Sequence, residues 1–143
     1  MSAKSPLYWI IFSALAIWQL PQFLVSLFML PFMGKLKVIG NRHFNIAFEG
    51  TKMKGGISLG PFAFLSPYLA KHDTYIAHEL DGHTVDSRIL GPLYLIVIGL
   101  PSLLNAEFKF TKCYHKFYTE KWADIHAGLT VDERCNLKWK NKE

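Results

Sequence analysis

Apolar residues are concentrated at the N-terminal end of the chain. From Leu7 to Met33 the sequence LYWIIFSALAIWQLPQFLVSLFMLPFM runs for 27 residues without a charged side chain. A helix needs only about 20 apolar residues to cross the hydrocarbon core of a bilayer. The pattern therefore predicts an N-terminal transmembrane helix, with residues 1–34 as a membrane anchor.

Polar and helix-breaking residues interrupt this run at Gln19, Pro21, Gln22 and Pro31. They predict either a kinked helix or a helix followed by an interfacial segment. The two glutamines either face protein or are simply tolerated near a kink. A cleaved signal peptide is the alternative to an anchor, because Lys4 supplies a weak basic region and SALA resembles a cleavage site. The apolar run continues well past that point, which favours the anchor.

The pattern changes after the apolar run, and residues 35–143 are predicted to form one small domain. Short apolar stretches separated by Gly, Asn and Pro predict strands near 36–39, 44–48 and 57–65. A helix is then expected from Asp73 or Thr74, as N-cap, to Gly91-Pro92. The fold class predicted is α+β: a membrane helix, a small sheet, a helix that carries histidines and a C-terminal helix.

Two further segments complete the predicted order of elements. The uncharged stretch from Ile89 to Ala106 has 18 residues, which is at the short limit for a membrane span. A buried or membrane-dipping helix is favoured, with a second span as the alternative. Residues 114–129 are expected to form the C-terminal helix.

The charge pattern bears on location and partners. The net charge is +5, and lysines and arginines follow the apolar run, which favours a membrane protein whose C-terminal domain is cytoplasmic. The lysines are too scattered to predict nucleic-acid binding. Cys113 and Cys135 are the only cysteines and do not form a metal-binding motif.

The motif HELDGH, from His78 to His83, carries the clearest chemistry. Its histidines are five residues apart, whereas the zinc-peptidase signature H-E-x-x-H places them four apart. On a regular helix a five-residue step separates two side chains by about 140°, so they would not reach one ion. A one-residue π-bulge at Asp81-Gly82 would realign them, since glycine tolerates unusual backbone geometry.

With such a bulge, His78 and His83 are predicted zinc ligands, and Glu79 is placed to act as general base on water. The best candidate for the third ligand is Glu120, which lies 37 residues after His83. Asp124 is four residues further along, on the same helical face, where it could orient a ligand histidine. His115 and His126 are competing donors. His126 is expected to face away from Glu120, and His115 is better suited to stabilise an oxyanion.

These residues resemble the gluzincin metallopeptidases, in which H-E-x-x-H is followed by a helix with E-x-x-x-D. The longer string GGISLG…HELDGHTVDSRILGPLYLIVIGLPSLL…HKFYTEKWAD, within residues 18–128, is similar to small bacterial and phage-type membrane proteins with a motif like H-E-x-G-H-T-x-Q-S-x-x-L-G-P-L-Y-L. The chain departs from that pattern by the extra residue Asp81 (or Leu80), and by Asp86 in place of Gln. The spacing of HELDGH resembles H-E-x-x-G-H of the dipeptidyl peptidase III family.

The resemblance implies a membrane-anchored zinc metallopeptidase-like hydrolase. Its metal ligands would be His78, His83 and Glu120, and Glu79 would activate the water. His115 or Tyr118 would help to polarise the scissile carbonyl group. The expected partners are the lipid bilayer and a peptide or protein substrate near the membrane.

Two alternatives to this function remain open at the level of the sequence. One is a non-catalytic membrane protein that keeps the fold, and the other is an intramembrane or lipid-directed hydrolase. The stretch GGISLGPFAFLS is either an edge strand that holds an extended substrate or an ordinary core strand.

Overall fold

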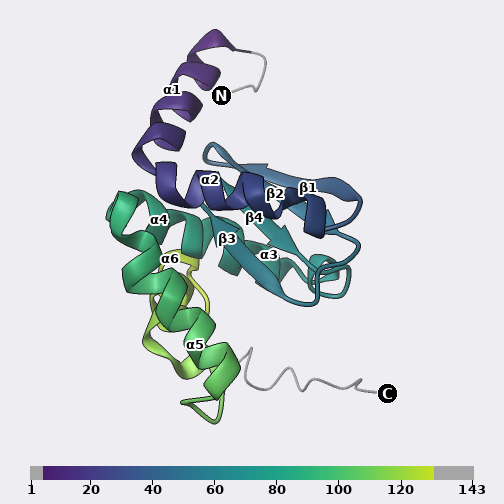
Figure 1. The fold of residues 1–143 in the computed structure, drawn as a ribbon, viewed down its shortest axis with the longest axis vertical. Coiled ribbons are helices and arrows are strands. Elements are labelled where there is room, and N and C mark those ends of the chain that lie inside the picture. The colour runs from purple at the N-terminus through teal and green to yellow at the C-terminus, as the bar shows by residue number, and fades with distance from the viewer. Residues whose placement is uncertain (1–4, 131–143) are drawn as a thin grey trace.

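A mixed four-stranded sheet lies at the centre of the structure, with helices packed around it (Figure 1). The computed structural model describes residues 5–130, and the remainder of the predicted 35–143 domain, with Cys135, lies outside this range. The predicted α+β class is confirmed. The elements are, in order: α1 (Pro6–Trp18), α2 (Leu20–Met29), a 3-10 turn (Leu30–Phe32), β1 (Leu36–Arg42), β2 (Asn45–Gly50), β3 (Gly56–Leu59), β4 (Phe62–Leu65), a 3-10 turn (Leu69–Lys71), α3 (Asp73–Ala77), a π-helix (His78–His83), α4 (Thr84–Leu90), a 3-10 turn (Gly91–Leu93), a second π-helix (Leu95–Gly99), α5 (Leu100–Phe108), a 3-10 turn (Tyr114–Lys116) and α6 (Tyr118–Ala127).

The sheet has the strand order β1-β2-β4-β3. Strand β2 pairs antiparallel with β1 and parallel with β4, and β3 pairs antiparallel with β4. The prediction of one strand over 57–65 is wrong, because this stretch forms a hairpin that turns at Gly60, whose φ of 65° favours glycine. The hairpin leaves β3 at the edge of the sheet.

The N-terminal apolar run forms two helices, α1 and α2, rather than one straight helix. No single helix between residues 5 and 130 is long and apolar enough to cross a membrane, but two bent pairs pass the same test together. The first pair is α1 with Leu20–Phe32, bent by 95°. In Figure 1, α1 stands out from the body and α2 lies across it. The interruption near Gln19 and Pro21 therefore corresponds to a break between helices.

The two glutamines of this run face protein, as one of the two interpretations predicted. Gln19 and Gln22 are fully buried. The Gln22 Nε2 donates to Ser87 Oγ at 3.0 Å and to the Gly91 carbonyl oxygen at 2.8 Å. Ser87 Oγ in turn donates to Gln19 Oε1 at 2.6 Å. These hydrogen bonds tie the N-terminal helices to the end of the histidine helix.

The histidine helix extends from Asp73 to Leu90 through α3, the π-helix and α4, close to its predicted limits. It ends at Gly91, whose φ of 51° and contact with the Trp18 ring both require glycine. The main apolar core fills the space between this helix and the sheet. Its buried members are Ala47, Ala63, Leu65, Leu69, Tyr75 and Leu80.

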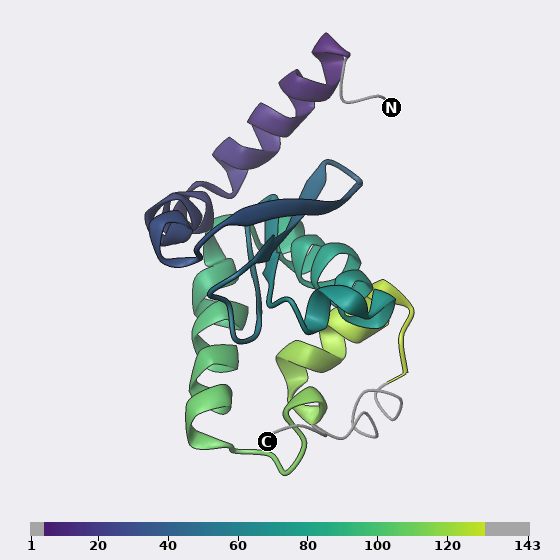
Figure 2. The same cartoon turned by 90° about the vertical axis from the view of Figure 1, so that its right-hand side faces the viewer.

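The second apolar stretch leaves the histidine helix at a sharp angle. Asp73–Leu93 and Leu95–Phe108 form the second bent pair, at 117°. In Figure 2, α5 runs along the same side of the molecule as α2, and α6 lies across from α5 beneath the sheet. Helix α6 packs directly on the π-helix: a Cβ added to Gly82 would lie 2.5 Å from the Ala123 carbonyl oxygen. Glycine at position 82 therefore permits the close contact between these helices.

Candidate metal centre

The π-helix at His78–His83 covers the whole HELDGH motif. It absorbs the extra residue, so the predicted bulge is confirmed. The rings of His78 and His83 lie with their centroids 4.7 Å apart, and both side chains are buried. Asp81 of the same segment points outward and pairs with Arg42, with 2.9 Å between Oδ2 and Nη1. The π-turn therefore directs both histidines to one place.

Glu120 of α6 completes this pair of histidines. The His78 Nε2 lies 3.0 Å from Glu120 Oε2, and the His83 Nε2 lies 3.4 Å from Glu120 Oε1. The three residues offer ligand atoms that all lie within 4.8 Å of one another, and all three are buried. Two ligands about 2.0–2.1 Å from a tetrahedral ion are about 3.4 Å apart. The group of His78, His83 and Glu120 could hold a metal ion.

Each histidine has an aspartate on its other ring nitrogen. The His78 Nδ1 lies 2.9 Å from Asp124 Oδ1, and the His83 Nδ1 lies 3.4 Å from Asp86 Oδ2. Asp86 also contacts the His126 Nδ1 at 2.7 Å through its other oxygen. The hydrogen bond of His78 with Asp124 holds the proton on Nδ1 and leaves the Nε2 lone pair for a metal, and the nearby Asp86 carboxylate favours the same tautomer of His83. Asp124 thus lies beside a predicted ligand histidine, and the contact of His126 is with Asp86.

The charges of the cluster are strongly coupled. Burial would lower the pKa of His83, but the Glu120 and Asp86 carboxylates outweigh burial and raise the pKa of His83 well above its ordinary value. Burial would raise the pKa of Glu120, but His83 and His78 hold it well below its ordinary value. Without a metal, a proton on His83 and a charge on Glu120 form an ion pair.

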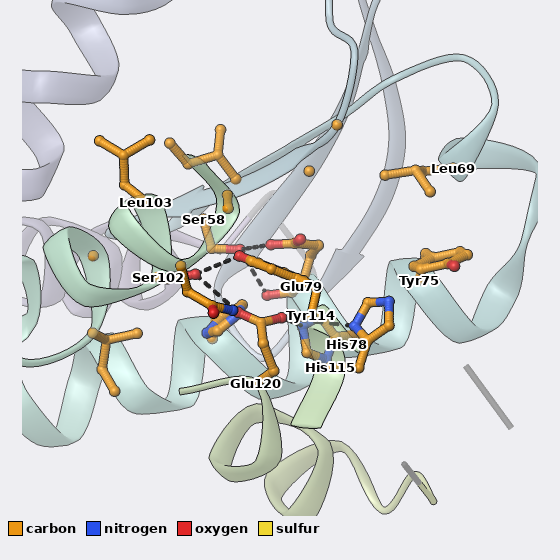
Figure 3. Close-up of a pocket in the computed structure, with 18 of the residues that line it drawn as sticks. Ser58, Leu69, Tyr75, His78, Glu79, Ser102, Leu103, Tyr114, His115 and Glu120 are labelled. Atoms are coloured by element: carbon orange, nitrogen blue, oxygen red, sulfur yellow. Dashed lines mark hydrogen bonds and ion pairs between the residues drawn. The ribbon is translucent and has the colours of Figure 1, made fainter. Parts of the chain in front are cut away.

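Glu79 lies next to this group, and its carboxylate is held by the edge strand β3. Ser58 Oγ donates to Glu79 Oε2 at 2.6 Å and to the Glu79 carbonyl oxygen at 3.0 Å. A Cβ at Gly56 would collide with Glu79 Oε1, so glycine at this position leaves room for the carboxylate. Figure 3 shows Ser58, Glu79 and Glu120 around the centre of the site. Glu79 is thus oriented from the strand and not only from its own helix.

A cavity of about 800 Å³ opens over these residues. Its walls include β3, α5 and the segment that precedes α6, and His78, Glu79, His83 and Glu120 lie within its lining. His115 is also in the lining, and its Nδ1 is 3.9 Å from Glu120 Oε2. The structure therefore brings His115 to the site, where the sequence predicted it.

Tyr118 lies elsewhere. Its hydroxyl group donates to the Val97 carbonyl oxygen at 2.6 Å, and Tyr118 is not among the residues that line the cavity. The tyrosines that line the cavity are Tyr75, Tyr94 and Tyr114. Ser102 Oγ is within hydrogen-bond distance of the Tyr114 hydroxyl group, and it donates to Glu120 Oε1 at 2.9 Å. Burial and the Glu120 carboxylate raise the pKa of Tyr114, which keeps this phenol protonated.

Sequence reasoning gave no role at the site to Asp86, Ser58, Tyr94, Ser102 or Tyr114. Only Asp86 carried a usable signal, because a residue three positions after His83 shares its helical face. The others come from segments whose packing on the histidine helix no spacing rule describes. For example, the Tyr94 hydroxyl group donates to the Ser58 carbonyl oxygen, 36 residues away, at 3.1 Å.

Comparison of the chain with protein-family models, with curated proteins and with solved structures found no match. The resemblance to gluzincins therefore stays an expectation based on motifs. The geometry of the His–His–Glu group is the firmest basis for a function.

Proposed function

We propose that the chain is a zinc-dependent hydrolase that cleaves a peptide bond, with His78, His83 and Glu120 as the metal ligands. The observation that carries this proposal is the buried group of two imidazoles and one carboxylate, beside a second carboxylate and open to a cavity. Three protein ligands of these types are typical of catalytic zinc, because one coordination position is left for water or substrate.

The donor set fits zinc better than calcium or magnesium, which prefer oxygen ligands. Bound zinc would supply a Lewis acid that polarises the scissile carbonyl group and lowers the pKa of a water molecule. Asp124 and Asp86 would keep both histidines in the tautomer that presents Nε2 to the metal.

Glu79 would accept the proton of the attacking water and pass it to the leaving amine. Its hydrogen bond from Ser58 fixes the orientation of the carboxylate and leaves it facing the cavity. His115, on the same wall, is the candidate that would stabilise the developing oxyanion. The edge strand β3 lines the cavity and offers a place where an extended peptide could add to the sheet.

The test separates ligands from base. His78→Ala and Glu120→Ala should each lower zinc content, measured by elemental analysis of protein purified in detergent. Glu79→Gln should keep zinc at the parental level and lower turnover of a fluorogenic peptide library by about 10²–10⁴-fold, because general-base catalysis typically contributes that factor. Asp81→Ala, on the same helix but paired with Arg42, is the matched control.

Three results would contradict the proposal. Equal zinc loss in the Glu79→Gln and Glu120→Ala proteins would make Glu79 a ligand and not the base. A parent that binds zinc but hydrolyses neither peptides nor lipids would support the non-catalytic alternative, and turnover of lipids alone would support the lipid-directed one.

A further inference from the structure

The helices on the outside of the molecule have their polar side chains inside and their apolar side chains outside. Gln22 and Ser26 of α2 and Gln19, which precedes it, are fully buried. The apolar residues of the opposite face are exposed, among them Leu24 (54%) and Phe28 (74%). A helix on the surface of a water-soluble protein has the reverse arrangement. The inverted pattern is expected where the surroundings are lipid, since polar groups there must find partners within the protein.

The arm from Leu93 to Phe108, within the second bent pair, repeats this inversion. Asn105 and the Tyr94 side chain are buried, and Ser102 points inward to Glu120. The outer side of the 3-10 turn Gly91–Leu93, the second π-helix (Leu95–Gly99) and α5 exposes a series of apolar residues at helical spacing: Leu93, Ile96, Leu100, Leu103, Leu104 and Phe108. No charged residue occurs from Ile89 to Ala106. Charges begin at Glu107 and Lys109, on either side of Phe108, which is the last residue of this series.

The two apolar faces lie on one side of the molecule. In Figure 2, α2 and α5 lie at the left-hand edge of the molecule, and the sheet and α6 lie to the right of them. The hydrogen bonds from Gln22 to Ser87 and Gly91 join the two bent pairs where they meet. A single bilayer can therefore contact both.

This apolar surface extends into the wall of the cavity. Leu103 and Phe110 line the cavity and are also exposed, at 65% and 63%. Lys109 and Lys112, on either side of Phe110, are exposed and line the cavity as well. Apolar and basic side chains that alternate in this way suit the boundary between acyl chains and anionic headgroups.

We propose that α1 and α2 and the arm from Leu93 to Phe108 lie against lipid, and that the cavity opens at the membrane boundary beside Leu103 and Phe110. One consequence rests on the proposed function. If the His–His–Glu site is a hydrolase, its substrate is an apolar polypeptide segment that reaches the cavity from the bilayer. We assign lipid to this apolar surface. A second copy of the chain would not explain why both segments bury their amides and hydroxyl groups.

The experiment is lipid photolabelling of the full chain. The protein is reconstituted into vesicles of phosphatidylcholine and phosphatidylglycerol that contain a phospholipid with a diazirine in its acyl chain, and labelled residues are mapped by mass spectrometry. Labels are expected on the outer faces of α2 and α5, and on Leu103 and Phe110. Trp122 and Ile125 of α6 are exposed apolar controls outside these segments and should stay unlabelled.

Labels confined to residues 6–33 would overturn the second contact, and labels on α6 equal to those on α5 would overturn the orientation. Crosslinks between two protein copies through α5, in place of lipid labels, would assign the surface to a dimer. The Glu79→Gln protein should give the parental labelling pattern, because labelling needs no turnover. A parent protein that shows the expected labels but hydrolyses no peptide would therefore count against the proposed hydrolase and leave the lipid contact standing.

Discussion

At the scale of single residues, each of the two candidate ligand histidines has an aspartate near its Nδ1 atom. Asp124 contacts the Nδ1 of His78, and Asp86 approaches the Nδ1 of His83 while its other oxygen contacts His126. His126 belongs to α6, and its side chain is one-third exposed. The residue that departs from the resembling pattern, Asp in place of Gln at position 86, thus has a partner of its own in this chain.

Loss of either aspartate should weaken metal binding without removing a ligand. Asp86→Ala and Asp124→Ala are each expected to lower zinc affinity by about 10–100-fold, because partners of ligand histidines typically contribute that much. Competition with a chelating zinc dye measures the change. His126→Ala should have a smaller effect, since it acts on His83 only through Asp86. Asp81→Ala controls for the loss of a carboxylate from the same helix, and an equal loss of affinity there would refute the assignment.

Zinc binding should release a proton from His83. The raised pKa of His83 keeps its imidazole charged at neutral pH in the metal-free protein, and a metal ligand must be neutral. Zinc affinity is therefore expected to rise with pH until the pH exceeds the pKa of His83 in the folded protein. Calorimetry at pH 7 in buffers of different ionisation enthalpy should show release of about one proton per zinc. Release of none would mean that His83 is neutral before zinc binds.

At the scale of elements, the centre depends on the contact between the π-helix and α6. The π-helix supplies two ligands and α6 supplies the third. Gly82 lets the two backbones approach, and Leu80 on the opposite side is buried in the core. Gly82→Ala should therefore push the helices apart, cost about 1–3 kcal/mol of stability and lower zinc occupancy. Denaturant unfolding of the metal-free protein and elemental analysis measure the two effects, and a variant of parental stability would contradict the contact.

Deletion of Asp81 tests the π-helix itself. Removing one residue converts HELDGH to HELGH and brings the histidines to four apart, where a regular α-helix directs both to one side. Because a π-turn absorbs one residue, the flanking α3 and α4 should keep their places, and the variant is expected to bind one zinc per chain. Asp81→Ala separates loss of the Arg42 ion pair from loss of the residue. A folded deletion variant without zinc would show that the π-geometry is built into the centre.

The sequence predicted the parts of the fold and site that follow from regular spacing. The histidine helix, its bulge and the pair of Glu120 and Asp124 could all be inferred, because each depends on the number of residues between side chains on one helix. The hairpin over 57–65 was missed because its apolar residues continue through the turn, and Gly60-Pro61 was the only signal. Ser58 and Tyr114 reach the site through contacts between distant segments, which depend on how the elements pack.

At the scale of the whole molecule, the candidate centre joins the π-helix His78–His83 to α6, two elements that are far apart in the sequence. The segment from Ile89 to Lys116 leaves the histidine helix, runs along the outer face and returns through α6. Glu120 of α6, which follows this segment, lies next to His78 and His83. The cavity lies between α5 and the sheet edge. One metal ion would thus hold together segments that are about 40 residues apart in the sequence.

This arrangement predicts that zinc stabilises the entire described fold and not the site alone. A ligand that binds only the folded state adds about 4 kcal/mol when its free concentration is about a thousand times its dissociation constant. For a chain of this size the gain should raise the melting temperature by on the order of 10 °C. Thermal unfolding in detergent, with buffered zinc or with excess chelator, measures the difference. Glu79→Gln should show the parental shift, because it keeps all three ligands, whereas Glu120→Ala should show little. A parent whose melting temperature is the same with zinc and with chelator would exclude a metal that bridges the π-helix and α6.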